Sequence, residues 1–210
     1  MRKFESIMLN ADPHAETAFC DNMDPGVILS NRLTLPSGAT IAYPGYLEVG
    51  EVRLLSLEDR VDSAALPAQC ALIYGDNAYI TDDGGDVAYI HCRMRHVEGA
   101  SNIRRKHPEY RTIGGRSAVH PGMDAGHFGL SLGQHPSLAM EQDSIMNRYG
   151  VWRELERDWD RLSRDGHEVI VRGVFADSDG GTYSPYWCIE EIIDDGDPFE
   201  YILTNDASQS

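Results

Sequence analysis

Short apolar runs separated by turn-forming residues dominate the first 94 positions, and this pattern is typical of β-strands. Three more apolar runs follow near the C-terminus, the last two separated by the acidic turn at 194–197. Residues 1–24 and 99–123 have no firm period, apart from one candidate strand at 116–119. The other predicted strands are 27–29, 32–35, 40–43, 52–55, 71–74, 78–81, 86–94, 168–175, 186–193 and 199–204.

A helical period replaces this pattern at residues 147–164. Trp152, Leu155, Trp159 and Leu162 recur there at spacings of three and four, which places them on one face of a helix. We expect both tryptophans to lie in the core, and the Asp-Gly pair after residue 164 to end the helix. Many strands with one main helix late in the chain predict an α+β fold with an antiparallel sheet, and not alternating βαβ units.

The charge of the chain is uneven. Its 210 residues carry 18 basic and 34 acidic side chains, a formal net charge of −16, which argues against a protein that coats nucleic acid through its whole surface. Residues 104–165, however, hold 10 of the basic residues against 9 acidic ones. An anionic ligand would be held most easily by this middle segment. The alternative is that its arginines pair with acids on a solvated helix.

The four cysteines, Cys20, Cys70, Cys92 and Cys188, are widely spaced and form no C-x-x-C pair. A disulfide scaffold or a four-cysteine zinc site would show more, or closer, cysteines. We therefore expect reduced, mostly buried thiols.

One short motif has the residue types of a hydrolytic centre. Asp124-Ala125-Gly126-His127 follows the candidate strand at 116–119, and Asn147 lies twenty residues beyond His127 at the head of the predicted helix. A histidine can take a proton from water, and an amide oxygen can hold a divalent ion; metal-assisted phosphodiester cleavage uses both. One oxygen ligand with several waters suits Mg²⁺. A three-histidine zinc site from His120, His127 and His135 is disfavoured, because no carboxylate or cysteine completes a recognisable spacing.

The same residues resemble a known family. The segment 124–127 is similar to the D-R-G-H or D-x-G-H motif of the DNA/RNA non-specific endonucleases, which belong to the His-Me finger, or ββα-metal, superfamily. Residues 147–156 resemble the helix of that family, and the segment 82–87 resembles a hairpin of its toxin-type members. The likeness covers roughly residues 72–205. It implies an inserted ββα-metal motif in the sheet and a metal-dependent nuclease acting on DNA, RNA or both.

The resemblance also implies roles for individual residues. His127 would be the general base, Asn147 the metal ligand, and Asp124 a residue that shapes the loop presenting His127. The scissile phosphate would be held by Arg116 or, less favoured, by Arg111 or Arg148. The implied cofactor is Mg²⁺, with Mn²⁺ as a substitute.

The chain departs from the family pattern at three places. Ala125 replaces the motif arginine, and Ser137 occupies the position of the family's first asparagine. The family has a metal-supporting glutamate eight residues after its asparagine. In this chain the corresponding residue is Glu156, which lies nine residues after Asn147. Glu156 aligns if Gly150 breaks the helix, which we favour; otherwise Glu154 substitutes or the carboxylate is lost.

These observations predict a mainly β N-terminal segment at 1–68, of unknown role, and a nuclease-like domain at 69–210. The alternative is a catalytically degenerate nuclease fold that acts as a binding or regulatory module. Nucleic acid is the expected partner, and the toxin-type likeness adds an immunity or inhibitor protein. The chain shows neither a signal peptide nor a membrane span, so the default expectation is a cytoplasmic protein, with signal-independent export as an alternative.

Overall fold

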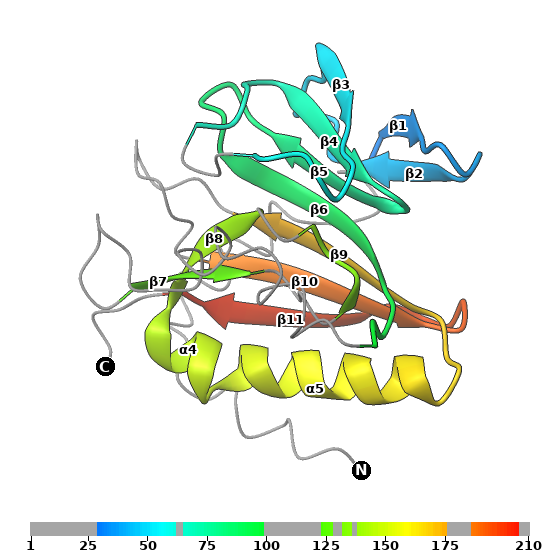
Figure 1. Ribbon diagram of the computed structural model, residues 1–210, viewed down its shortest axis with the longest axis vertical. Coiled ribbons are helices and arrows are strands. Elements are labelled where there is room, and N and C mark those ends of the chain that lie inside the picture. The colour runs from blue at the N-terminus through cyan, green and yellow to red at the C-terminus, as the bar shows by residue number, and fades with distance from the viewer. Residues whose placement is uncertain are drawn as a thin grey trace.

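A computed structural model of the chain describes residues 29–61, 65–98, 123–127, 132–135, 138–175 and 186–205, and for 123–127 it describes the backbone alone. The described part is α+β and consists mostly of strands (Figure 1).

A seven-stranded sheet forms the centre of the fold, in the order β11-β10-β9-β6-β5-β4-β3. Most neighbouring strands run antiparallel, but β3 pairs with β4 in parallel, so the sheet is mixed and the prediction of an antiparallel sheet is wrong at this edge. Because β3 precedes the predicted boundary between residues 68 and 69, that boundary lies between two strands that pair with each other. The strands are β3 (Glu51–Leu54), β4 (Cys70–Tyr74), β5 (Asn77–Thr81), β6 (Val87–Met94), β9 (Val169–Phe175), β10 (Tyr186–Ile193) and β11 (Phe199–Thr204).

One face of the sheet is covered by helix α5 (Val151–Arg164), which packs against β6 and β9. Its predicted apolar face is confirmed, because Trp152, Leu155, Trp159 and Leu162 are all buried. The rings of Trp152 and Trp159 meet edge to face at 5.3 Å, and those of Trp152 and Trp187 at 5.1 Å. This aromatic cluster fixes the helix on the sheet.

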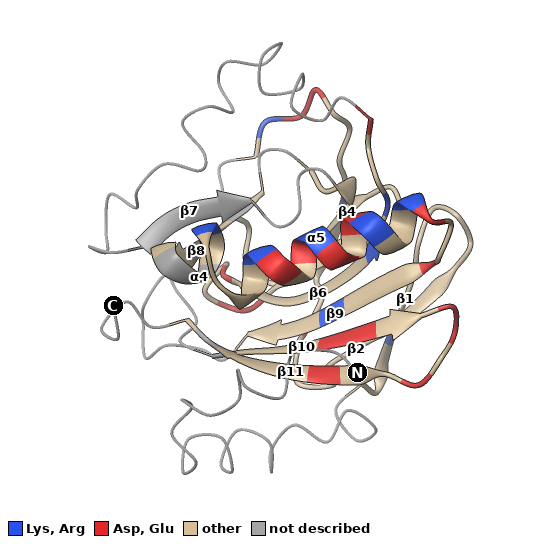
Figure 2. Ribbon diagram, turned by 90° about the horizontal axis from the view of Figure 1, so that it is seen from below, with Lys and Arg blue, Asp and Glu red and all other residues tan. Residues whose placement is uncertain are grey.

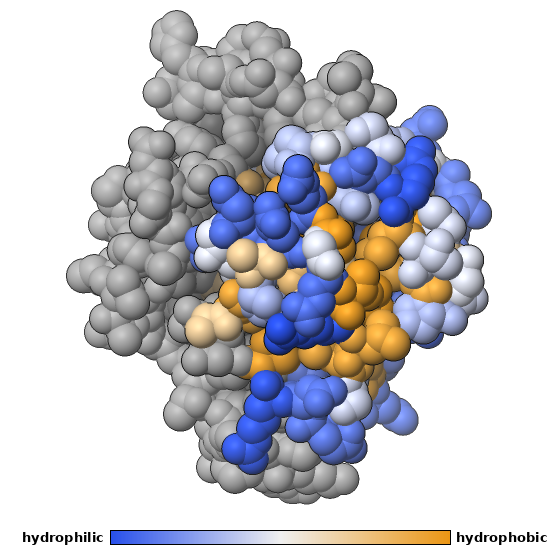
Figure 3. All heavy atoms as spheres, turned by 90° about the horizontal axis from the view of Figure 1, so that it is seen from above, coloured by the Kyte–Doolittle hydropathy of each residue, from blue (hydrophilic) through white to orange (hydrophobic). Residues whose placement is uncertain are grey.

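The opposite face of the sheet packs against a hairpin of β1 (Asn31–Thr34) and β2 (Thr40–Tyr43). Tyr43 shares a buried cluster with Tyr89, whose hydroxyl donates to the Ala42 carbonyl at 2.8 Å. Apolar side chains reach the surface near β3, where Val52 and Leu54 are exposed; Figure 3 views this end of the molecule.

A second hairpin lies between β6 and β9 in the chain. β7 (Met123–His127) pairs antiparallel with β8 (Ala139–Asp143), and α4 (Ser144–Arg148) begins directly after β8. Between α4 and α5, Gly150 has an extended backbone, with φ −92° and ψ −163°, and forms the N-cap of α5. The single helix predicted at 147–164 is therefore divided between α4 and α5, with a break at Gly150. This is the break that we favoured in order to align Glu156 with the supporting glutamate of the resembling family.

Most predicted strands agree with the structure to within about a residue. The predicted strand at 27–29 is only partly described, and Leu29 lies outside any strand. The irregular segments at 1–24 and 99–123, with the candidate strand at 116–119, lie wholly or almost wholly outside the described residues. Cys70 and Cys92 are free and buried, as expected for reduced thiols, and Cys188 is partly buried.

Candidate functional site

The β7–β8 hairpin and α4 bring the two ends of the predicted site to one substructure. His127 is the last residue of β7 and pairs with Ala139, while Asp124 pairs with Gln142. Asn147 lies on α4, which contacts both β7 and β8. The backbone thus places the D-A-G-H segment and Asn147 on neighbouring elements. The side chains of Asp124 and His127 lie outside the description.

Buried polar contacts attach this substructure to the sheet. The backbone N–H of Asp143, the last residue of β8, donates to Asn205 Oδ1 at 2.6 Å. Asn205 follows β11 and is fully buried, and Gln142 beside Asp143 is fully buried as well. No local sequence signal pointed to Asn205, because the bond joins residues 62 positions apart.

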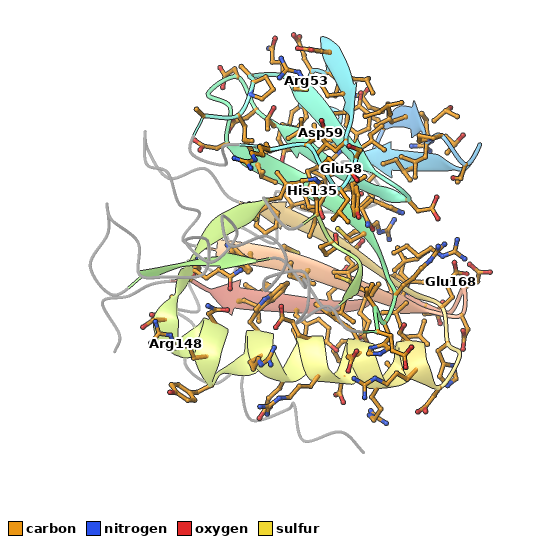
Figure 4. The ribbon with its side chains drawn as sticks, in the orientation of Figure 1. Arg53, Glu58, Asp59, His135, Arg148 and Glu168 are labelled. Atoms are coloured by element: carbon orange, nitrogen blue, oxygen red, sulfur yellow. The ribbon has the colours of Figure 1, made fainter. Side chains whose placement is uncertain are left out.

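The α4–α5 break exposes the residues next to Asn147. Asn147 itself is partly buried, Arg148 is exposed, and Tyr149 is 81% exposed. Figure 4 shows Arg148 at the end of the helical layer opposite to Glu168. Arg148 therefore lies at the surface within one residue of the predicted metal ligand, as a phosphate contact would require.

Glu156 has a different environment from Asn147. It is 8% exposed, and its Oε2 accepts a hydrogen bond from Arg153 Nη1 at 3.0 Å within α5. Its predicted metal role stays a prediction.

Two predicted phosphate contacts, Arg111 and Arg116, lie outside the described residues. His135, considered for a zinc site, is buried, and its Nε2 lies 2.9 Å from the Ser56 carbonyl. Burial lowers the pKa of His135, and its ring packs edge to face on Tyr74. These contacts give His135 a structural role between the sheet and the 55–61 connection.

The donor chemistry fits a hard cation with few protein ligands. Among the described residues, no group of three or more His, Cys, Asp or Glu side chains is arranged to hold a metal ion. The amide oxygen of Asn147 is a ligand that Mg²⁺ accepts, and Mg²⁺ keeps most of its waters in such sites. Asn147 therefore suits a largely hydrated Mg²⁺ ion.

Sequence analysis missed a polar cavity of about 510 Å³ at the far end of α5. Its charged side chains are paired: Arg95 contacts Asp76 at 2.7 Å, and Arg93 contacts Glu168. His96 Nδ1 lies 2.6 Å from an Asp160 carboxylate oxygen. The pairing leaves little net charge in the cavity, whose lining comes from residues 93–96, 163–164 and 166–168.

Comparisons with known proteins show a structural likeness without a sequence match. No protein-family model matches the chain, and no curated protein matches its sequence. Among solved structures, the crystal structure of NucA from Streptococcus agalactiae with no metal bound is similar, with a TM-score of 0.48 and 11% identity. The match covers 93% of this chain and 90% of that chain.

Neither α4 nor α5 is long and apolar enough to span a bilayer.

Proposed function

We propose that the protein is a metal-dependent nuclease that hydrolyses phosphodiester bonds of DNA, RNA or both. The observation that carries the proposal is the backbone arrangement of β7, β8 and α4. The D-A-G-H segment forms β7, β8 pairs with it, and the helix that contacts both strands carries Asn147. A general base and a metal-ligating amide on adjacent elements are the parts that metal-assisted hydrolysis needs.

In this proposal, His127 accepts a proton from the attacking water, and Asp124 supports the backbone that presents His127. Asn147 holds Mg²⁺, which when bound stabilises the charge that develops on the phosphate and the leaving oxygen. Arg148 donates charge-assisted hydrogen bonds to the phosphate from the surface next to Asn147. Arg116 and Arg111 are the other proposed phosphate contacts, and Glu156 is the proposed supporting carboxylate.

The test is cleavage of plasmid DNA and of RNA by the purified chain with Mg²⁺, with and without EDTA. The variant His127→Ala removes the proposed base. The matched control is His167→Ala, because His167 is an exposed histidine that pairs with Asp194 at 2.5 Å, away from β7. We expect cleavage by the parent and by His167→Ala, and a loss of at least about a hundredfold in His127→Ala. Equal rates in His127→Ala and the parent would contradict the proposal.

A folded parent protein that cleaves neither nucleic acid with Mg²⁺ would also contradict the proposal. That result would favour the alternative of a non-catalytic binding module on a degenerate nuclease fold.

A further inference from the structure

Tyr149 is the most exposed large hydrophobic or aromatic side chain among the described residues. Its side chain is 81% exposed, whereas Tyr79 and Tyr89 in the sheet are almost completely buried. It lies in the short break between α4 and α5, one residue after Arg148 and two after Asn147. The hydroxyl of Tyr149 can bond to water, and its exposed ring is free to stack on a ligand with an apolar face.

Arginines continue from this break along the outer surface of α5. At about 100° per residue, Arg153, Arg157, Arg161 and Arg164 fall within an arc of about 80°. All four are exposed, on the side of the helix opposite to its buried face. The row spans about 16 Å of helix, which is long enough to contact several successive phosphates of one strand. Figure 2 shows these basic positions at intervals along α5.

Acidic neighbours reduce the net positive charge of the arginine row but leave its guanidinium N–H donors in place. Arg153 pairs with Glu156, Arg161 with Asp158 at 2.9 Å, and Arg164 with Asp160 at 2.5 Å. Within the described residues, Arg157 takes part in no ion pair. Such a row should attract a polyanion locally but weakly, and salt should screen the attraction strongly.

We propose that the outer surface of α4 and α5 binds single-stranded nucleic acid, an inference that rests on the proposed function. Tyr149 stacks on a base next to the scissile phosphate, and the arginine row follows the backbone away from Asn147. Single-stranded nucleic acid fits better than a duplex, because a surface ring can stack only on a base whose face is uncovered. Stacking on aromatic rings combined with basic side chains along the backbone is how proteins bind single strands with little sequence preference.

The test measures binding and cleavage separately. Fluorescence anisotropy in EDTA gives the affinity for labelled single-stranded DNA, single-stranded RNA and the corresponding DNA duplex, without cleavage. The variants are Tyr149→Ala, Tyr149→Trp and Arg157→Gln, which breaks no ion pair among the described residues. The matched controls are Tyr46→Ala, at a tyrosine 60% exposed near β3, and Arg53→Gln, at an arginine that Figure 4 shows at the other end of the molecule from Arg148.

We expect Tyr149→Ala to weaken single-strand binding about fivefold or more, to affect the duplex less, and to be rescued by Tyr149→Trp. Arg157→Gln should reduce the salt slope of single-strand binding by about 0.7. Equal losses for duplex and single strands in Tyr149→Ala, or an equal loss in Tyr46→Ala, would overturn the inference.

The two proposals fail in different ways. Tyr149-dependent binding by a chain that never cleaves with Mg²⁺ would contradict the nuclease and support the binding surface. Cleavage that depends on His127 but is unchanged in Tyr149→Ala and Arg157→Gln would contradict the binding surface alone.

Discussion

The Asn205 side chain accepts a hydrogen bond from the Asp143 backbone N–H at 2.6 Å, which ties the end of β8 to the residue that follows β11. Asn205 is fully buried and Asp143 is 7% exposed. Because α4 begins at Ser144, this bond fixes the start of the helix that carries Asn147 relative to the central sheet. The candidate site therefore depends on a contact with the last strand of the chain.

Asn205→Ala should destabilise the protein and lower its activity together. Removing the acceptor leaves a buried backbone N–H without this partner, which costs about 1–3 kcal/mol of unfolding free energy. Denaturant unfolding measures the first effect, and cleavage at a temperature where the variant is folded measures the second. Asn31→Ala serves as the control, because it removes an amide on β1 whose hydrogen bond, to the Leu47 carbonyl at 3.0 Å, lies elsewhere in the fold. Unchanged activity in a destabilised Asn205→Ala would mean that the bond stabilises the fold without positioning α4.

A second buried contact joins α5 to the sheet. Trp159 Nε1 donates to Glu191 Oε2 at 2.6 Å, and both residues are buried. Trp159→Phe should cost about 1–3 kcal/mol of unfolding free energy, because it leaves a buried carboxylate oxygen without its donor, and the smaller ring adds a cavity. Adding Glu191→Leu to that variant removes this buried carboxylate, at the cost of its weak contact with the Tyr201 hydroxyl at 3.5 Å. In urea unfolding, the double variant should therefore be more stable than Trp159→Phe; equal or lower stability would contradict this account.

The central strands carry a titratable row on the face opposite to α5. His91 pairs in register with Arg172, and Arg172 pairs with Glu190, whose Oε2 it contacts at 2.7 Å. Burial lowers the pKa of His91 from its ordinary value to about 4, with the Arg172 charge adding to the effect and Asp76 opposing it. Burial also raises the pKa of Glu190.

This row predicts acid sensitivity of the fold. Between pH 6.5 and about 4 the unfolded chain binds a proton at His91 that the folded chain does not. The stability from neutral His91 is thus fully present above pH 6.5 and falls by about 3 kcal/mol as pH drops toward 4. His91→Gln should lose stability less steeply over this range than the parent, while Glu190 is common to both. Parallel urea midpoints against pH in the two proteins would contradict the burial of neutral His91.

Local patterns predicted the strands well because each strand in this sheet has its own apolar run and its own turn. The parallel pairing of β3 with β4 was missed, because it depends on the 55–69 connection returning across the sheet edge and not on the pattern within either strand. The break at Gly150 was favoured from the sequence, because it would align Glu156 with the glutamate of the family that the segment resembles. The spacing of apolar residues alone predicted one continuous helix at 147–164, with no break at Gly150.

The candidate site was predictable only where its residues lie close in sequence. Asn147 and the D-A-G-H segment are twenty residues apart, and one hairpin with one helix brings their backbones together. The support from Asn205 and the exposure of Tyr149 depend on packing between distant segments or on the absence of packing. A linear pattern of residue types does not encode either property.

Asn147→Ala should lose metal-dependent behaviour while keeping the fold. If Asn147 supplies the protein ligand, its loss raises the Mg²⁺ concentration for half-maximal cleavage by about tenfold or more, whereas Asn147→Asp keeps an oxygen ligand and retains more activity. Mg²⁺ should raise the melting temperature of the parent by mass action but not that of Asn147→Ala. The matched control is Asn31→Ala, since Asn31 lies on β1 and its amide donates to the Leu47 carbonyl at 3.0 Å. An identical Mg²⁺ dependence in Asn147→Ala and the parent would move the metal away from α4, and the proposed division of labour between His127 and Asn147 would then be wrong.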